Sequence, residues 1–225
     1  MPDTTGTTRA VSDSGIDVSH HQHTIHWNTV AAAGIQFVFI KATEGQSVVD
    51  PRFGANWTGA RSAGILRGAY HFFRPDIPAQ AQANNFLTLL QSVYPAELAP
   101  ALDLELRKLD GTDAWDGIPL SQRTGLAVEW LTAVEQRLGR RPMVYLSPSF
   151  ALEKLGGATA LGTYPLWIAH YTTNPQPRVP SAWSDWTFWQ YTERGKIGGI
   201  SGTVDRNKFN GPANDLLALS ATAPQ

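Results

Sequence analysis

The chain has 225 residues, of which 42% are apolar and 16% are charged, and its 18 basic side chains nearly balance its 19 acidic ones. This composition can fill one sizeable core, and the balance argues against a general nucleic-acid binder, which normally shows a basic excess. The absence of cysteine excludes disulfides, thiolate catalysis and cysteine-based metal sites.

The two ends of the chain have the composition of tails. Residues 1–13 are polar and predict neither a signal peptide nor a membrane span, and we expect residues 213–225 to form a second tail. Residues 14–212 show no composition break and no repeat, which predicts a single domain. The apolar runs inside this domain are too short to cross a bilayer.

Eight short apolar runs recur along the chain at the spacing of a closed β/α barrel. In chain order they are Gly15–Ser19, Gln36–Ala42, Leu66–Phe73, Pro100–Leu106, Pro142–Ser147, Pro165–Tyr171, Trp186–Thr192 and Thr203–Arg206. Their apolar residues are consecutive rather than alternating, which is typical of parallel strands buried on both faces.

Helical segments separate the earlier runs. The predicted helices are Trp27–Ala33, Pro51–Ala63, Pro78–Leu90 and Ser121–Leu138. In the last helix, Ser121 can cap the N-terminus, apolar side chains repeat every four residues, and Gly139 and Pro142 follow as stop signals. The later gaps are short and rich in Gly, Pro and Asn, which indicates loops or hairpins. The predicted fold class is α/β, a single TIM-barrel-like (β/α) barrel with eight strands and a reduced helix set.

Two acidic residues close the fourth run. Asp103 and Glu105 are two residues apart, so on a strand their side chains share one face, while the leucines around them point to the other. Neighbouring carboxylates repel each other, so the pKa of one should rise and leave a proton available near neutral pH. Glycoside hydrolysis needs such a pair: a protonated acid for the leaving oxygen and a carboxylate that stabilises the positive sugar.

A solvated strand end is the simpler interpretation of an isolated Asp-x-Glu, but two further acids argue against it here. Asp17 ends the first run and Asp205 ends the last, and the first and last strands of a closed barrel are neighbours. Unpaired buried carboxylates are costly, and no matching set of basic residues stands beside these four. The sequence therefore predicts a functional site at the end of the barrel where catalytic groups usually lie.

Several segments, in this order along the chain, resemble the glycoside hydrolase family 25 lysozymes, the N-acetylmuramidases. They are Gly15–Gln22, Phe37–Gly45, Gly68–Pro75, Leu102–Glu105, Trp189–Tyr191 and Gly199–Asp205. The resemblance spans roughly residues 15–212 and implies an eight-stranded barrel with about five helices, fewer than a full barrel carries.

The resemblance implies hydrolysis of the β-1,4 bond between N-acetylmuramic acid and N-acetylglucosamine in bacterial peptidoglycan, with retention at the anomeric carbon. It assigns Glu105 as the general acid/base and Asp103 as the second carboxylate, with Asp17 and Asp205 completing the mouth of the barrel. Asp103 either attacks the sugar or orients the substrate's own 2-acetamido group, and we favour the second. We expect a monomer that acts on peptidoglycan strands outside the cell or facing its wall. We expect it to use no cofactor or metal and to bind no nucleic acid.

A glycan groove also needs aromatic faces and polar groups. The aromatic candidates are Tyr70, Tyr145, Trp167, Tyr171 and Trp189, and Gln190 is a candidate hydrogen-bond donor to an acetamide. Each aromatic residue alone is more often part of a core, but Tyr70 and Trp189 lie in segments that carry the resemblance. Lys41 and Glu44 form either a surface ion pair or, as the resemblance favours, part of the rim, with Lys41 meeting an acid or the substrate's carboxylate.

Parts of the sequence also suggest a metal site, another class of glycosidase or a non-catalytic barrel. The histidines His20, His21, His23 and His26 crowd a strand end and loop, without the spacing of metal ligands, so we expect no metal there. A chitinase-like β-N-acetylglucosaminidase would also use an acid pair on its fourth strand, but Ala101 breaks its fuller acidic motif. A non-catalytic peptidoglycan-binding barrel would typically lack the general acid that Glu105 supplies.

Overall fold

A closed barrel of eight strands forms the centre of the computed structural model, which describes residues 12–94, 97–109 and 111–221. The order around the barrel is β1-β11-β10-β9-β8-β5-β4-β2, and β2 pairs back with β1. These strands are β1 (Ser12–Val18), β2 (Phe37–Glu44), β4 (Leu66–Phe72), β5 (Ala101–Asp103), β8 (Met143–Leu146), β9 (Leu166–Ala169), β10 (Phe188–Gly195) and β11 (Val204–Phe209). The predicted fold class is confirmed, and each predicted run overlaps one barrel strand.

The last strand runs in a direction that the sequence analysis did not predict. β11 is antiparallel to both of its neighbours, β10 and β1, whereas the other adjacent barrel strands are parallel. An antiparallel neighbour needs no crossover helix, so a loop is enough to join β10 to β11. Because β11 is reversed, it begins at the end of the barrel where the other strands finish. Asp205 therefore stands near the start of its strand rather than at its end.

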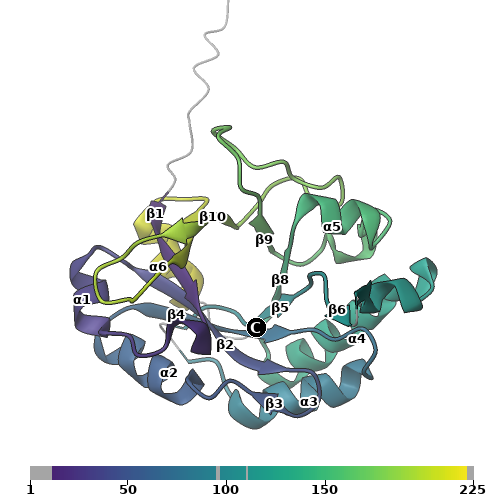
Figure 1. Cartoon of the computed structure of the whole chain (residues 1–225), viewed down its shortest axis with the longest axis horizontal. Helices are drawn as coiled ribbons and strands as arrows, with labels where there is room; N and C mark the ends of the chain where they lie inside the picture. The colour runs from purple at the N-terminus through teal and green to yellow at the C-terminus, as the bar shows by residue number, and fades with distance from the viewer. Residues whose placement is uncertain (1–11, 95–96, 110, 222–225) are drawn as a thin grey trace, which may run out of the picture.

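Four predicted helices are confirmed and follow one another around the outside of the barrel (Figure 1). They are α1 (Trp27–Ala32), α2 (Phe53–Ser62), α3 (Ala79–Leu89) and α4 (Leu120–Leu138). Ser121 does not cap α4, because the helix already begins at Leu120, after Pro119. The helix α5 (Pro148–Glu153) was missed, since it is too short to show an apolar repeat. None of the helices in the described residues is long and apolar enough to span a bilayer.

Short elements complete the loops. Among them are β3 (Val48–Val49), which pairs with β2, the hairpin β6 (Lys108–Leu109) and β7 (Thr112–Asp113), and the 3-10 helices His20–Gln22, Ala114–Gly117 and Thr159–Leu161.

The C-terminal segment contributes to the core, although the sequence predicted a tail over residues 213–225. Its described part forms α6 (Ala213–Ala221), which brings the described α-helices to six, against about five expected. Leu216 is buried with Leu66 and Phe209 in the barrel interior, at the end where β2 and β4 begin. Leu219, three residues later, is partly buried against the same cluster. The other parts of the predicted tails, 1–11 and 222–225, lie outside the described residues.

Side chains alternate between the inside and the outside of the barrel wall. On β2, Phe37 and Phe39 point inward, whereas Ile40 packs outward against the helices. The Phe39 ring stacks on Trp167 with centroids 4.3 Å apart, and the Phe37 ring lies 5.2 Å from that of Phe188. Aromatic rings thus fill the barrel below its mouth, and the polar side chains gather at the open end.

Gly15 on β1 allows this packing and provides a test of it. A Cβ atom at this position would lie 2.0 Å from Cζ of the fully buried Phe37 ring. We expect Gly15→Ala to lower the free energy of unfolding by about 2 kcal/mol or more, measured by urea denaturation. The matched control is Gly125→Ala on α4, where a Cβ meets open space and should stabilise the helix by up to ~1 kcal/mol. Equal stabilities for the two variants would contradict the packing.

Candidate active site

Four carboxyl groups meet at the open end of the barrel. Asp17 is the penultimate residue of β1, and Asp103 is the last residue of β5, with Glu105 two residues beyond. Asp205 is the second residue of β11 and pairs in register with Asp17. Each of the four lies close enough to at least one other to influence its ionisation. The structure therefore brings together all four acids that the sequence placed at the mouth.

The strand β5 is shorter than predicted, and this changes the position of Glu105. β5 ends at Asp103, so Glu105 stands on the segment after the strand. Leu106, expected to point away from the site, is 51% exposed and lines a cavity beside Glu105. The indole N–H of Trp115 donates to the Glu105 carbonyl oxygen at 2.9 Å and holds the backbone there. Glu105 thus projects into open space while Asp103 stays in the barrel wall.

Asp17 and Asp205 form a hydrogen-bonded pair. Burial raises the pKa of Asp17, although hydrogen bonds to its carboxylate oppose the shift. Burial and the charge of Asp17 raise the pKa of Asp205 to about 8. Asp205 therefore holds a proton at neutral pH and donates it to Asp17.

Asp103 and Glu105 differ in exposure. Asp103 is buried, and burial followed by the charge of Glu105 raises its pKa well above the ordinary range. Glu105 faces the cavity, and loss of hydration raises its pKa as well, whereas the Lys41 ammonium lowers the pKa of both. Oδ1 of Asp103 is buried without a hydrogen-bond partner among the described residues. The pair thus combines a titrating acid in the cavity with a buried carboxyl group that has a free acceptor oxygen.

Gln190 connects the aromatic residues of the mouth to the acids. Its Nε2 donates to Oδ2 of Asp17 at 2.8 Å, and its Oε1 accepts hydrogen bonds from the hydroxyls of Tyr145 at 2.9 Å and Tyr171 at 2.7 Å. One amide therefore fixes two tyrosines relative to Asp17. The predicted role of Gln190 as a donor to substrate is not visible in this arrangement, because its amide group is already engaged inside the protein.

Asn207 also links Asp17 to an aromatic residue, and the sequence analysis did not identify it. Its Nδ2 donates to Oδ2 of Asp17 at 2.8 Å, and its Oδ1 accepts from Nε1 of Trp167 at 2.7 Å. Asn207 lies two residues after Asp205 on β11, so both side chains face the barrel interior. That alternation is the signal from which it could have been identified.

The remaining aromatic candidates separate into two groups. Tyr70 lies among the acids. Its burial, followed by the charges of Asp17 and Asp103, therefore raises the pKa of its phenol. Trp189, in contrast, is buried on the outer side of the barrel wall, where its Nε1 donates to the His170 carbonyl oxygen at 2.7 Å. Adjacent residues of a strand face opposite sides, so Trp189 and Gln190 could not both have faced the mouth.

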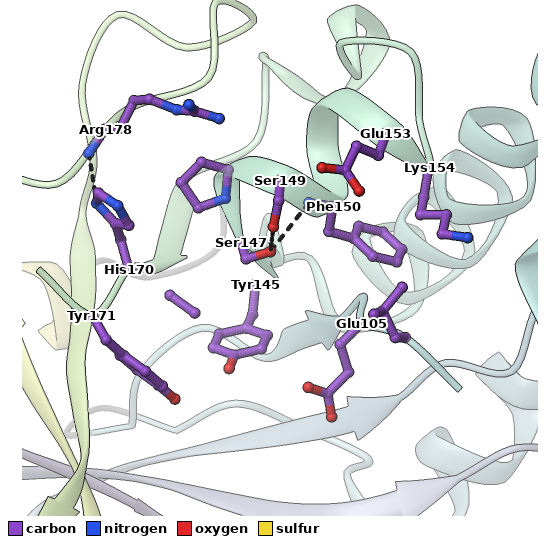
Figure 2. A pocket seen from close by; sticks show the side chains of 13 residues that line it. Glu105, Tyr145, Ser147, Ser149, Phe150, Glu153, Lys154, His170, Tyr171 and Arg178 are labelled. Atoms are coloured by element: carbon purple, nitrogen blue, oxygen red, sulfur yellow. Dashed lines mark hydrogen bonds between the residues drawn. The ribbon is translucent and has the colours of Figure 1, made fainter. Parts of the chain in front are cut away.

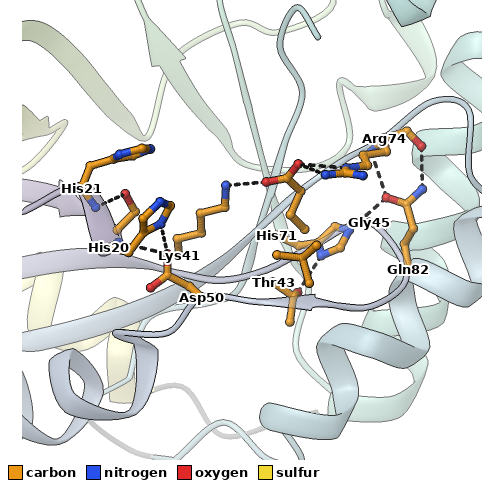
Figure 3. Close-up of polar contacts among 12 residues, drawn as sticks. His20, His21, Lys41, Thr43, Gly45, Asp50, His71, Arg74 and Gln82 are labelled. Atoms are coloured by element: carbon orange, nitrogen blue, oxygen red, sulfur yellow. Dashed lines mark hydrogen bonds and ion pairs between the residues drawn. The ribbon is translucent and has the colours of Figure 1, made fainter. Parts of the chain in front are cut away.

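A chain of ion pairs runs along one side of the mouth (Figure 3). Nζ of Lys41 lies 2.8 Å from Oε2 of Glu44, and Nε of Arg74 donates to Oε1 of Glu44 at 2.8 Å. The Lys41 side chain is only 12% exposed. Lys41 therefore pairs with Glu44 and also stands near the acids, where its charge lowers the pKa of Asp103 and of Glu105.

A buried histidine supports the loop that carries Arg74. Nδ1 of His71 lies 2.7 Å from Oγ1 of Thr43, and its Nε2 lies 3.1 Å from Oε1 of Gln82. Gln82 in turn accepts from the backbone N–H of Arg74 at 2.9 Å and donates to its carbonyl oxygen at 2.8 Å. Burial lowers the pKa of His71 to about 4, so the ring is neutral at the pH of most assays.

The histidine-rich segment is occupied with internal contacts. Nδ1 of His20 lies 2.8 Å from Oδ2 of Asp50, and the His20 and His21 rings are 4.0 Å apart. No group of three or more His, Cys, Asp or Glu side chains is arranged to hold a metal ion within the part of the chain that the structure describes.

An open cavity of about 590 Å³ adjoins Glu105 (Figure 2). Tyr145 and Tyr171 line it near Glu105, and Arg178 lies at its far end. The other residues in its lining are Leu106, Ser147, Pro148, Ser149, Phe150, Glu153, Lys154, Ala169 and His170. Its volume and its mixture of aromatic and polar groups fit a small organic ligand.

A closed β/α barrel with paired carboxyl groups at the mouth, beside a cavity of this size, is the architecture of a glycoside hydrolase. Residues 16–200 match the family model described as glycosyl hydrolases family 25, and the chain belongs to this family.

Individual relatives agree with this assignment. The chain is 41% identical over 210 residues to "Lysozyme M1" of Streptomyces globisporus, covering 92% of this chain and 70% of the relative. It is 31% identical to an N,O-diacetylmuramidase of Arthroderma benhamiae, covering 93% of this chain and 87% of the relative. Among solved structures, it matches the bacterial lysozyme from Streptomyces coelicolor with a TM-score of 0.87 and 39% identity, over 96% of this chain and 98% of that one.

The raised pKa of Asp205 predicts a pH-dependent stability. The carboxyl group ionises near 3.8 when unfolded but at about 8 when folded, so the folded protein binds more protons between these values. The free energy of unfolding contributed by this group is complete below pH 3.8 and is lost as the pH rises toward 8. We expect Asp205→Asn to avoid this loss, so that its Tm exceeds that of the parent protein by ~2 °C or more at pH 8 but not at pH 4.

Thermal denaturation followed by circular dichroism at several pH values measures this difference. Glu129→Gln, which removes an exposed carboxylate on α4, is the control and should show no such trend. A Tm difference between Asp205→Asn and the parent that stays constant across the range would contradict the assigned pKa.

Proposed function

We propose that the chain hydrolyses the β-1,4 bond between N-acetylmuramic acid and N-acetylglucosamine in bacterial peptidoglycan, with retention at the anomeric carbon. The observation that carries the proposal is the Asp103–Glu105 pair, in which a protonatable acid faces the cavity and a buried carboxyl group stands beside it. The names of the relatives, lysozyme and N,O-diacetylmuramidase, support the choice of substrate. The protein would act as a monomer on the cell wall, outside the cell or facing the wall.

In the first step, Glu105 gives its proton to the glycosidic oxygen as the bond from this oxygen to the anomeric carbon breaks. The carbonyl oxygen of the substrate's 2-acetamido group attacks the anomeric carbon from the opposite face and forms a cyclic intermediate. Asp103 accepts a hydrogen bond from the acetamido N–H, a role for which its free Oδ1 is suited. The developing positive charge is stabilised by the carboxylates of the mouth.

In the second step, Glu105 takes a proton from a water molecule, which attacks the anomeric carbon and reopens the ring. The two inversions give net retention, one water is consumed, and Glu105 regains its proton. Asp17 and Asp205 act as a fixed pair in the wall, where their hydrogen bonds hold Gln190 and, through it, Tyr145 and Tyr171.

The bond specificity is tested by mass spectrometry of digested peptidoglycan. We expect every new reducing end to be N-acetylmuramic acid. New reducing ends at N-acetylglucosamine, or digestion of soluble chitin at a comparable rate, would contradict the proposal.

The role of Glu105 predicts a large kinetic effect without loss of folding. We expect Glu105→Gln to reduce kcat by about 10³-fold, within the range for removal of a general acid. The circular dichroism spectrum should be unchanged, and Glu129→Gln should retain full activity. Turnover by Glu105→Gln near that of the parent protein would remove Glu105 from the mechanism.

Asp103→Asn should also be severely impaired, because the neutral amide oxygen accepts the acetamido hydrogen bond more weakly than a carboxylate and carries no charge to stabilise the positive sugar. Mass spectrometry of the intact protein during turnover distinguishes the two mechanisms. A glycosyl adduct on Asp103 would show direct attack by this residue, whereas substrate assistance leaves the protein unmodified.

The Lys41 ammonium predicts a shift in the pH–rate profile. Its charge lowers the pKa of Glu105, so its removal should raise this pKa. The limb at high pH, where the general acid loses its proton, should therefore move to higher pH in Lys41→Met, as measured from kcat/KM. Lys196→Met, at an exposed position in the loop after β10, is the matched control. Profiles that coincide for Lys41→Met and the parent would exclude this coupling.

A further inference from the structure

Arg178 differs from the other basic residue that lines the cavity. Nζ of Lys154 lies 3.0 Å from Oδ2 of Asp113 and 2.6 Å from Oδ1 of Asp116, so two carboxylates balance its charge. The guanidinium of Arg178 has no carboxylate within ion-pair distance among the described residues, and it is exposed to the cavity. Arg178 is thus the unbalanced positive charge of this lining.

The loop that carries Arg178 is held in place by several contacts. The backbone N–H of Arg178 donates to Nδ1 of His170, just after β9, at 3.0 Å. Nε1 of Trp186 donates to Oε1 of Gln176 at 3.0 Å, and Pro177 is buried between these two attachments. The guanidinium therefore extends from a fixed backbone, which reduces the entropy lost when it binds a ligand.

Glu105 and Arg178 stand at different ends of the cavity (Figure 2). The lining also holds the carboxylate of Glu153, which makes no ion pair with Arg178 among the described residues. A neutral sugar can bind beside the acids, but an anionic substituent on that sugar is repelled by them and attracted toward Arg178. The planar guanidinium can make two parallel hydrogen bonds to a carboxylate.

We propose that Arg178 binds a carboxylate of the acidic peptide attached to the glycan, and so makes this end of the cavity a peptide subsite. This inference rests on the proposed function, because it assigns the sugar to the acids and the peptide to the remaining space. The cavity of about 590 Å³ is in the range that holds a ligand larger than one sugar. Ser149, whose hydroxyl lies 3.0 Å from Oγ of Ser147, adds a polar side chain to the same lining.

The test compares two soluble substrates that differ only in charge. One is uncrosslinked glycan chains with their peptides, and the other is the same chains after conversion of the peptide carboxylates to amides. We expect Arg178→Gln to lower kcat/KM about tenfold on the first substrate, through KM, and less than about twofold on the second. Arg178→Lys should retain part of the activity on the charged chains, because it keeps the charge but loses the paired geometry.

Arg61→Gln is the matched control for general attraction of an anionic substrate. Arg61 is exposed in the last turn of α2, at the opposite end of the barrel, and its removal should affect neither substrate. Equal losses of Arg178→Gln on charged and amidated chains, or no loss on either, would overturn the peptide subsite. Failure of the parent protein to cleave either substrate would instead overturn the proposed function.

Discussion

The burial of several carboxyl groups in one small volume is the constraint on which the rest of this site depends. Each carboxylate loses hydration on entering the mouth, and like charges at short range add to the cost. The protein reduces this cost in three ways. Asp205 retains a proton, the amides of Gln190 and Asn207 donate to Asp17, and Lys41 places a positive charge beside Asp103 and Glu105.

These arrangements divide the acids into two pairs with different properties. Asp17 and Asp205 are linked to each other and to the aromatic residues beneath the mouth, so their positions are fixed. For Asp103 and Glu105 no such donor is found among the described residues. Burial raises the pKa of both, the charge of Glu105 raises the pKa of Asp103 further, and Lys41 lowers both. Ion pairs link Lys41 through Glu44 to Arg74, and the Arg74 loop is supported by Gln82 and His71. These contacts position the Lys41 charge and so affect the ionisation of Asp103 and Glu105, the pair proposed to carry out the chemistry.

Much of the barrel could be predicted from the sequence, because its strands are short apolar runs at regular intervals and Asp103 and Glu105 follow one of them. The direction of β11 was left open, because the short gap before it indicated either a loop or a hairpin and only a hairpin makes the two strands antiparallel. Trp189 was assigned to the site because it lies in a segment that carries the resemblance. Successive side chains of a strand point to opposite faces, however, and Trp189 faces outward. Asn207 and Arg74 act through contacts between distant segments, which local patterns do not report.

The reversed last strand has a consequence for biosynthesis. The Asp17 carboxylate accepts a hydrogen bond from Asn207, 190 positions later in the chain, so its environment is complete only after β1 and β11 have met. Strands β1 to β10 emerge from the ribosome before β11, and until then the seam of the barrel is open beside Asp17. A polypeptide that ends before β11 therefore lacks the assembled cluster of acids, and the proposed hydrolysis depends on this strand.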